Sequence, residues 1–214
     1  MKTTKTTLLT LIFAIIASAT SIAKPDNDQL FNAALKGDLN TINKLIEKGY
    51  DINTRDKNNN NALYYAVYAN DYEAIQMLVE LGIDINVTNN SDNTPLMVAS
   101  TLNKELALRA LLENGADTEI KHSTGQTALT VAAFKGNMES VYTLISYGAD
   151  VNVMPTSGFS ALKYAAINGD LSLAKVLINN GAYDMKDRNG DSALKFAISK
   201  NHQNVAELIK NIEK

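Results

Sequence analysis

Few residues of this chain have the types and spacing that catalysis or metal binding requires. The sequence contains two histidines, His122 and His202, which lie far apart, and it has no cysteine. Neither histidine has a second ligand at the spacing of a metal site, and no glycine-rich phosphate-binding motif occurs. We therefore expect both histidines to be exposed polar residues, and we expect no metal ion and no cofactor.

Carboxylates are numerous, but their spacing argues against acid–base catalysis. Asp51, Asp84, Asp117 and Asp150 recur at a constant interval of 33 residues, each two positions after a glycine. Catalysis of that kind needs carboxyl groups positioned at one reacting centre, whereas equal spacing predicts one structural role repeated along the chain. The sequence thus predicts no catalytic residues, and a protein that is not an enzyme.

The same interval defines an internal repeat, and such a period decides the architecture of a chain. The glycines of the repeat are Gly49, Gly82, Gly115, Gly148 and Gly181, and strings such as Gly148-Ala149-Asp150 begin at them. A second recurring string places Asn, Thr or Ser before Ala or Pro and then Leu. Its copies are Asn61-Ala62-Leu63, Thr94-Pro95-Leu96, Thr127-Ala128-Leu129, Ser160-Ala161-Leu162 and, one residue early, Ser192-Ala193-Leu194.

Each repeat predicts two helices and a loop. Thr or Ser before Pro or Ala favours the start of a helix, and apolar residues at helical spacing, such as Val141, Leu144 and Ile145, indicate a second helix. The repeat glycine favours the left-handed conformation that ends that helix. A turn with positive φ is expected in each following loop, at Asn59, Asp92, Gly125, Gly158 and Gly190.

On these strings the sequence resembles the ankyrin-repeat family, whose 33-residue units begin with Thr-Pro-Leu-His and end with Gly-Ala-Asp-Val-Asn. The resemblance covers about residues 28–213 and implies an all-α solenoid of about six helix-turn-helix-loop units. We expect one domain over residues 24–214, with capping units at both ends because a stacked array must present a polar outer face. The predicted units are about 28–58, 59–91, 92–124, 125–157, 158–189 and 190–214.

Two expectations about packing follow from the units. Leucines at one position of each unit should form a continuous buried seam, completed by an isoleucine: Leu45, Leu78, Leu111, Leu144, Leu177 and Ile209. The sequence departs from the family at its His position, which holds Tyr64, Met97, Thr130, Lys163 and Lys195. The family's bonds from that His to neighbouring loops should then be weaker, and the loops more mobile.

The first 23 residues predict export. Lys2 and Lys5 precede an apolar run from Leu8 to Ala19, and small residues lead to a cleavage site after Ala23. The run is shorter than the about 20 residues that an uncleaved membrane anchor needs. We therefore expect a signal peptide, a mature chain free of the membrane and a periplasmic location, with full secretion as the alternative. The net charge of −3 argues against nucleic acid as a partner.

The family resemblance implies binding through a concave face formed by the first helices and the loop tips. The apolar candidates are Leu35, Tyr68, Leu102, Phe134, Phe159 and Ile167, and the polar tips are represented by Lys57, Asn90, Ser123 and Arg188. A contiguous exposed apolar row marks an interaction site; the alternative is that Tyr68 and Phe134 only pack against neighbouring helices.

Two functions fit these features. One is a monomeric periplasmic module that binds or inhibits an envelope protein of a bacterium. The other is a secreted effector that binds a host-cell protein. Both make a protein of unknown identity the partner, because the repeat specifies a shape and leaves the ligand open.

Overall fold

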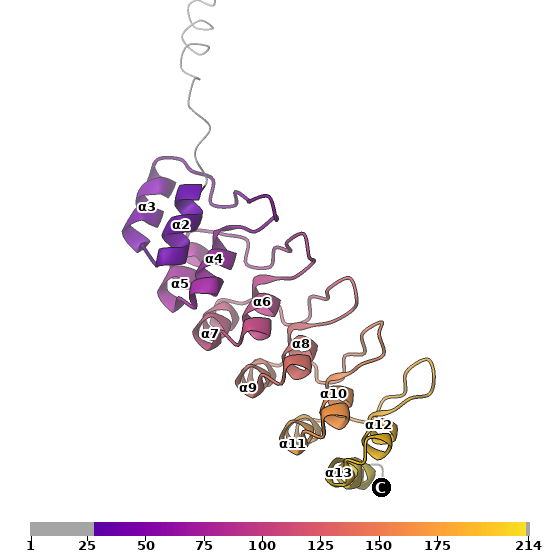
Figure 1. The fold of residues 1–214 in the computed structure, drawn as a ribbon. Coiled ribbons are helices and arrows are strands. Elements are labelled where there is room, and N and C mark those ends of the chain that lie inside the picture. The colour runs from indigo at the N-terminus through magenta and orange to yellow at the C-terminus, as the bar shows by residue number, and fades with distance from the viewer. Residues whose placement is uncertain (1–27, 213–214) are drawn as a thin grey trace, which may run out of the picture.

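The computed structural model describes residues 28–212, and this part of the chain forms twelve helices in six pairs without a β-strand (Figure 1). The first helix of each pair is called inner and the second outer. The inner helices are α2 (Asp28–Lys36), α4 (Ala62–Ala69), α6 (Pro95–Leu102), α8 (Ala128–Lys135), α10 (Ala161–Asn168) and α12 (Ala193–Ser199). The outer helices are α3 (Leu39–Glu47), α5 (Tyr72–Glu80), α7 (Glu105–Glu113), α9 (Met138–Ser146), α11 (Leu171–Asn179) and α13 (Gln203–Ile212).

The pairs stack one after another, and the loops project beside the inner helices, away from the outer ones (Figure 1). The all-α solenoid expected from the repeat is therefore confirmed. The proposed signal peptide and its cleavage site at Ala23 lie outside the described residues.

The recurring strings start and end the helices as expected. Thr94 precedes α6, and its hydroxyl accepts the backbone N–H of Met97 at 3.2 Å, with Pro95 in the first turn. The other residues of this column, Asn61, Thr127, Ser160 and Ser192, cap their helices in the same way. The five repeat glycines all have φ between 83° and 89°, a region that side chains with a Cβ rarely adopt. Positive φ is also confirmed at Asn59, Asp92, Gly125, Gly158 and Gly190.

The core is one apolar layer that runs between the two helix layers. The predicted seam is buried along its whole length. Alanines of the inner helices, such as Ala99 and Ala132, are fully buried and let neighbouring helices approach closely. Lys210, at the seam's edge in the last unit, is exposed, as expected for a capping unit. The last unit nevertheless leaves Ile198 exposed, because no further helix covers a position that is buried in all earlier units.

The regularly spaced aspartates are structural, as their spacing predicted. Asp84 accepts the backbone N–H of Asn86 at 3.1 Å, while its own backbone N–H donates to Asn53 of the preceding unit at 2.8 Å. Equivalent bonds between successive units join Asp117 to Asn86 and Asp150 to Glu119. Each carboxylate thus stabilises the turn of its own unit, and each turn is hydrogen-bonded to the preceding one. The carboxylates are therefore spread along the stack and do not meet at one reacting centre.

Within residues 28–212, every helix is too short or too polar to cross a lipid bilayer.

Candidate protein-binding surface

The inner helices expose a row of apolar side chains beside the loops. Leu35, Tyr68, Leu102 and Phe134 are all exposed, and Phe134 leaves 51% of its surface accessible. Ile167, in the same column as Phe134, is half-buried. The row expected from the sequence is therefore accessible to a partner over α2 to α8 and partly covered over α10.

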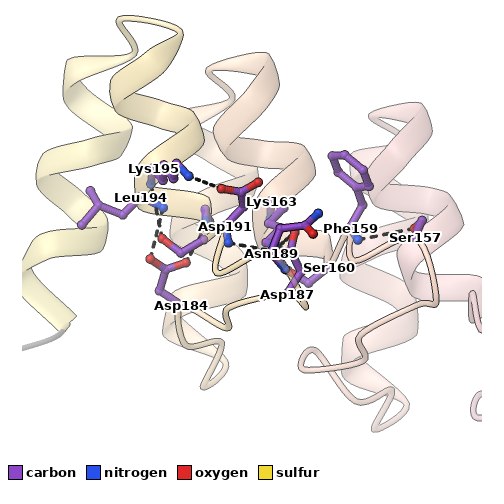
Figure 2. A network of polar contacts seen from close by, with 12 residues as sticks. Ser157, Phe159, Ser160, Lys163, Asp184, Asp187, Asn189, Asp191, Leu194 and Lys195 are labelled. Carbon is purple, nitrogen blue, oxygen red and sulfur yellow. Dashed lines mark hydrogen bonds and ion pairs between the residues drawn. The ribbon is translucent and has the colours of Figure 1, made fainter.

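Four aromatic rings from successive units meet at the C-terminal end of this row. The Phe134 ring lies 5.1 Å from Tyr164, Tyr164 lies 5.7 Å from Phe159, and Phe159 lies 5.8 Å from Phe196, measured between ring centroids. We call Phe134, Phe159, Tyr164 and Phe196 the C-terminal aromatic cluster. Figure 2 shows Phe159 standing at the end of its loop, directly before α10. Each ring packs against the next, and Phe134 is half-exposed, so the cluster both joins successive units and offers apolar surface to a partner.

A second group of rings occupies the N-terminal end. Phe31 stacks on Tyr65 at 4.9 Å, and Tyr65 contacts the exposed Tyr68 edge to face at 6.2 Å. The hydroxyl of Tyr65 donates to Asp56 in the adjoining loop at 2.8 Å. Burial and this bond raise the pKa of Tyr65 to about 12, because both disfavour the charged phenolate.

The predicted tip residues Lys57, Asn90, Ser123 and Arg188 are all exposed. Asn90 also joins two neighbouring loops. Its backbone N–H donates to the Asn58 carbonyl at 2.9 Å, and its side-chain amide donates to the Lys57 carbonyl at 3.0 Å. The loop before α8 and the loop before α10 are joined similarly, through Thr124 and Thr156. Two pairs of neighbouring tips are thus bonded together, and they form a polar edge next to the apolar row.

The expectation of weaker bonds at the family's His position is wrong at two of its five residues. The hydroxyl of fully buried Tyr64 lies 2.8 Å from the Val87 carbonyl and 2.5 Å from the Asn93 carbonyl, in the following loop. Fully buried Lys163 reaches Asp187 of the following loop at 2.9 Å. A long side chain with a terminal donor therefore replaces the imidazole at both positions.

Lys163 and Asp187 form an ion pair under the last loop (Figure 2). The Lys163 ammonium lowers the pKa of Asp187 to about 2, and backbone N–H groups of Asp191 and Asn189 also favour its charged form. Lys163 lies 5.9 Å from the centroid of Phe196 as well. The Lys163 ammonium therefore contacts both a carboxylate of the last loop and one ring of the C-terminal aromatic cluster.

Both histidines are half-buried, which corrects the expectation that they are simply exposed. Nδ1 of His122 accepts the backbone N–H of Thr124 at 3.0 Å, and Nε2 of His202 lies 3.1 Å from the Ile167 carbonyl. Both rings thus support neighbouring backbone. Residues 28–212 contain no cluster of three His, Cys, Asp or Glu side chains able to hold a metal ion.

The outer helices also expose apolar side chains, but without a comparable cluster. Leu106 on α7 and Tyr142 on α9 leave 50% and 49% of their surfaces accessible. Leu106 is aliphatic, and among the described residues the Tyr142 ring packs against no other aromatic ring. Exposure alone therefore does not indicate which face binds a partner, whereas the clustering of aromatic rings favours the inner face as the binding surface.

Sequence analysis missed Tyr65, Tyr164 and Phe196 as members of the surface. They occupy one column of the repeat, in which the middle units hold Val98 and Val131. Three aromatic residues within this one column, at the second, fifth and sixth units, were the available signal.

Comparisons with known proteins agree with this architecture. A family model described as ankyrin repeats (three copies) matches residues 30–122, 85–155, 107–184 and 129–214. A solved ankyrin-repeat domain from Acinetobacter baumannii AYE is 32% identical, with a TM-score of 0.77 over 85% of this chain and 96% of that one. A second solved ankyrin-repeat protein is 26% identical, with a TM-score of 0.77 over 86% of this chain and 98% of that one. No match was found among curated proteins.

Proposed function

This chain belongs to the ankyrin-repeat family, and we propose that it is a non-catalytic module that binds another protein through its inner helices and loop tips. Ankyrin repeats are generally protein-interaction modules, and the fold is typically a binding scaffold without catalysis. The observation that carries the proposal is the contiguous exposed row of Leu35, Tyr68, Leu102 and Phe134 beside the polar loop tips. An apolar centre with a polar edge is the usual anatomy of a protein interface.

The aromatic residues are the expected anchors of that interface. Aromatic side chains lose little conformational entropy on binding and are enriched among interface residues whose truncation costs about 2 kcal/mol or more. Phe134 packs against Tyr164, with ring centroids 5.1 Å apart, yet keeps half its surface accessible. It therefore combines support from a neighbouring unit with surface that a partner can contact.

The proposed site of action is the bacterial periplasm, where the protein would bind or inhibit an envelope protein. The basic and apolar composition of residues 1–23 supports export, and the similarity to a domain from Acinetobacter baumannii supports a bacterial source. Secretion followed by binding of a host-cell protein is the alternative. Both use the same face, and they differ in the compartment where the partner is found.

The proposal is tested by capture from the source bacterium. The full chain, with a C-terminal affinity tag, is expressed with its own N-terminal segment, cross-linked in intact cells and purified from periplasm and medium. Tyr68→Asp/Phe134→Asp disrupts the inner row, and Leu106→Asp/Tyr142→Asp places the same charges at similarly exposed sites of the outer helices. Circular dichroism and thermal melting confirm that both variants fold.

The proposal expects a protein that is recovered with the wild type and with the outer-helix variant but lost with the inner-row variant. Capture that survives the inner-row change, or that fails equally with both variants, would show that this face is not the binding site. Recovery from medium together with a host protein would favour the secreted alternative.

A further inference from the structure

Charge is distributed unevenly between the two helix layers. The inner helices contain Lys36, Lys135, Lys163 and Lys195, with Asp28 as their single acidic residue. Every outer helix except α11 contains a glutamate: Glu47, Glu73, Glu105, Glu139 and Glu207 are examples. The outer helices contain four basic residues as well, Lys44, Arg109, Lys175 and Lys210, so the two layers differ in their acidic residues. The inner helices therefore carry an excess of basic side chains and the outer helices an excess of carboxylates.

The acidic residues of the last loop are already engaged within the protein (Figure 2). Asp187 pairs with Lys163, and Asp191 pairs with Lys195. Asp184 accepts the backbone N–H groups of Ala193 and Leu194, at 2.6 and 3.1 Å. The charges of Asp187 and Asp191 are therefore balanced by Lys163 and Lys195, while Asp184 is directed towards the start of α12.

Four basic side chains of the C-terminal units, on the inner helices and in the last loop or next to α12, form no ion pair in residues 28–212. They are Lys135, Lys186, Arg188 and Lys200, and all four are exposed. Lys135 lies directly at the cluster, with its ammonium 5.3 Å from the Phe134 ring centroid.

An apolar hollow adjoins one of these four cations, Lys186. It has a volume of about 450 Å³ and lies against α12, where Leu194 and Ile198 form its apolar part; Lys195, which pairs with Asp191, also lines it. Ile198 is uncovered because no further unit follows it, so this hollow lies at the C-terminal end of the stack and adds apolar surface beside Lys186.

Resting on the proposed function, we infer that this C-terminal part of the inner face binds an acidic segment of the partner, one with aromatic or aliphatic anchors between its carboxylates. Carboxylates would meet the unpaired cations while apolar side chains fill the space over the aromatic cluster. Charge complementarity of this kind steers association and selects partners. A nucleic acid is disfavoured because its phosphate backbone would also approach the acidic remainder of the chain.

The inference is tested with a defined probe, a displayed library of random 12-residue peptides selected against the folded full chain. Dissociation constants of the selected peptides are then measured for the wild type and two variants with equal net charge. Lys135→Glu/Arg188→Glu reverses one charge at the aromatic cluster and one in the last loop, and Lys44→Glu/Lys175→Glu reverses exposed charges on outer helices. A 20-nucleotide oligothymidylate is measured in parallel.

Selected peptides are expected to combine Asp or Glu with aromatic or aliphatic residues. Their dissociation constants should rise at least about tenfold with the inner charge reversal, with a smaller rise for the outer one, and the difference should shrink in high salt. Neutral or basic selected peptides, equal effects of the two reversals, failure to select any acidic peptide, or tighter binding of the oligonucleotide would each overturn the inference. Peptides that are not acidic but are lost with Phe134→Asp would leave the proposed function standing while this inference fails.

Discussion

Removing one buried hydroxyl should loosen a loop of the proposed binding face. Tyr64→Phe deletes only the hydroxyl oxygen and its proton from a side chain that is 0% exposed. That hydroxyl lies 2.8 Å from the Val87 carbonyl and 2.5 Å from the Asn93 carbonyl, which are at the two ends of one loop. With one proton, it can donate fully to only one of them at a time.

The expected cost follows from this geometry. A buried acceptor left without its donor costs about 1–3 kcal/mol of unfolding free energy. For a domain of this size each kcal/mol lowers the melting temperature by roughly 2–4 °C, so a decrease of roughly 2–12 °C is expected. Burial raises the pKa of Tyr64, which keeps the hydroxyl protonated, and the effect should therefore not change between neutral and mildly alkaline pH.

Urea unfolding and amide hydrogen exchange of residues 87–93 measure the effect. Tyr142→Phe is the matched control, because it makes the same chemical change at a side chain that is 49% exposed, and its effect should stay within about 0.5 kcal/mol. Equal stability of Tyr64→Phe and the wild type, with unchanged exchange in the loop, would refute the view that this hydroxyl replaces the family's imidazole.

Three further predictions concern the core, the acid limit of stability and a close backbone contact. Leu111→Ala, in the middle of the buried seam, should lower the unfolding free energy by about 2–5 kcal/mol in urea titrations, whereas exposed Leu106→Ala should change it little; similar losses would contradict the seam. The lowered pKa of Asp187, about 2 against an ordinary 3.8, means that its ion pair stabilises the fold above about pH 4 and that this contribution is lost as pH falls through 2. The stability curves of wild type and Asp187→Asn should therefore differ at pH 7 and converge towards pH 2, and curves that stay parallel would exclude the pair as a source of stability. Gly169→Ala should destabilise more than Gly136→Ala in thermal melting, because both have φ near 70° but only the new Cβ at 169 would meet the His202 ring, at 2.5 Å; equal losses would point to backbone strain alone.

Local features of the fold follow directly from the sequence. Helix starts, positive-φ turns and the buried seam depend on residue types within one unit, and five in-register copies make the pattern unambiguous. Thr94-Pro95-Leu96 alone specifies a capped helix start. The exposed apolar row could also be located, because Leu35, Tyr68 and Phe134 occupy one column of the 33-residue repeat and Leu102 lies one position from it.

Side-chain contacts between units became evident only in the tertiary structure. The sequence predicts that Phe134 lies on the inner face, but only the stacking of α8, α10 and α12 brings it to Tyr164 and, through Phe159, to Phe196. Composition favours exposed lysines, yet Lys163 is fully buried because the next loop places Asp187 against its ammonium. That pairing also determines which cations remain available to a partner. These outcomes depend on distances between residues more than 20 positions apart, which propensity and spacing within a unit do not encode, whereas caps and turns depend on neighbours within a few residues.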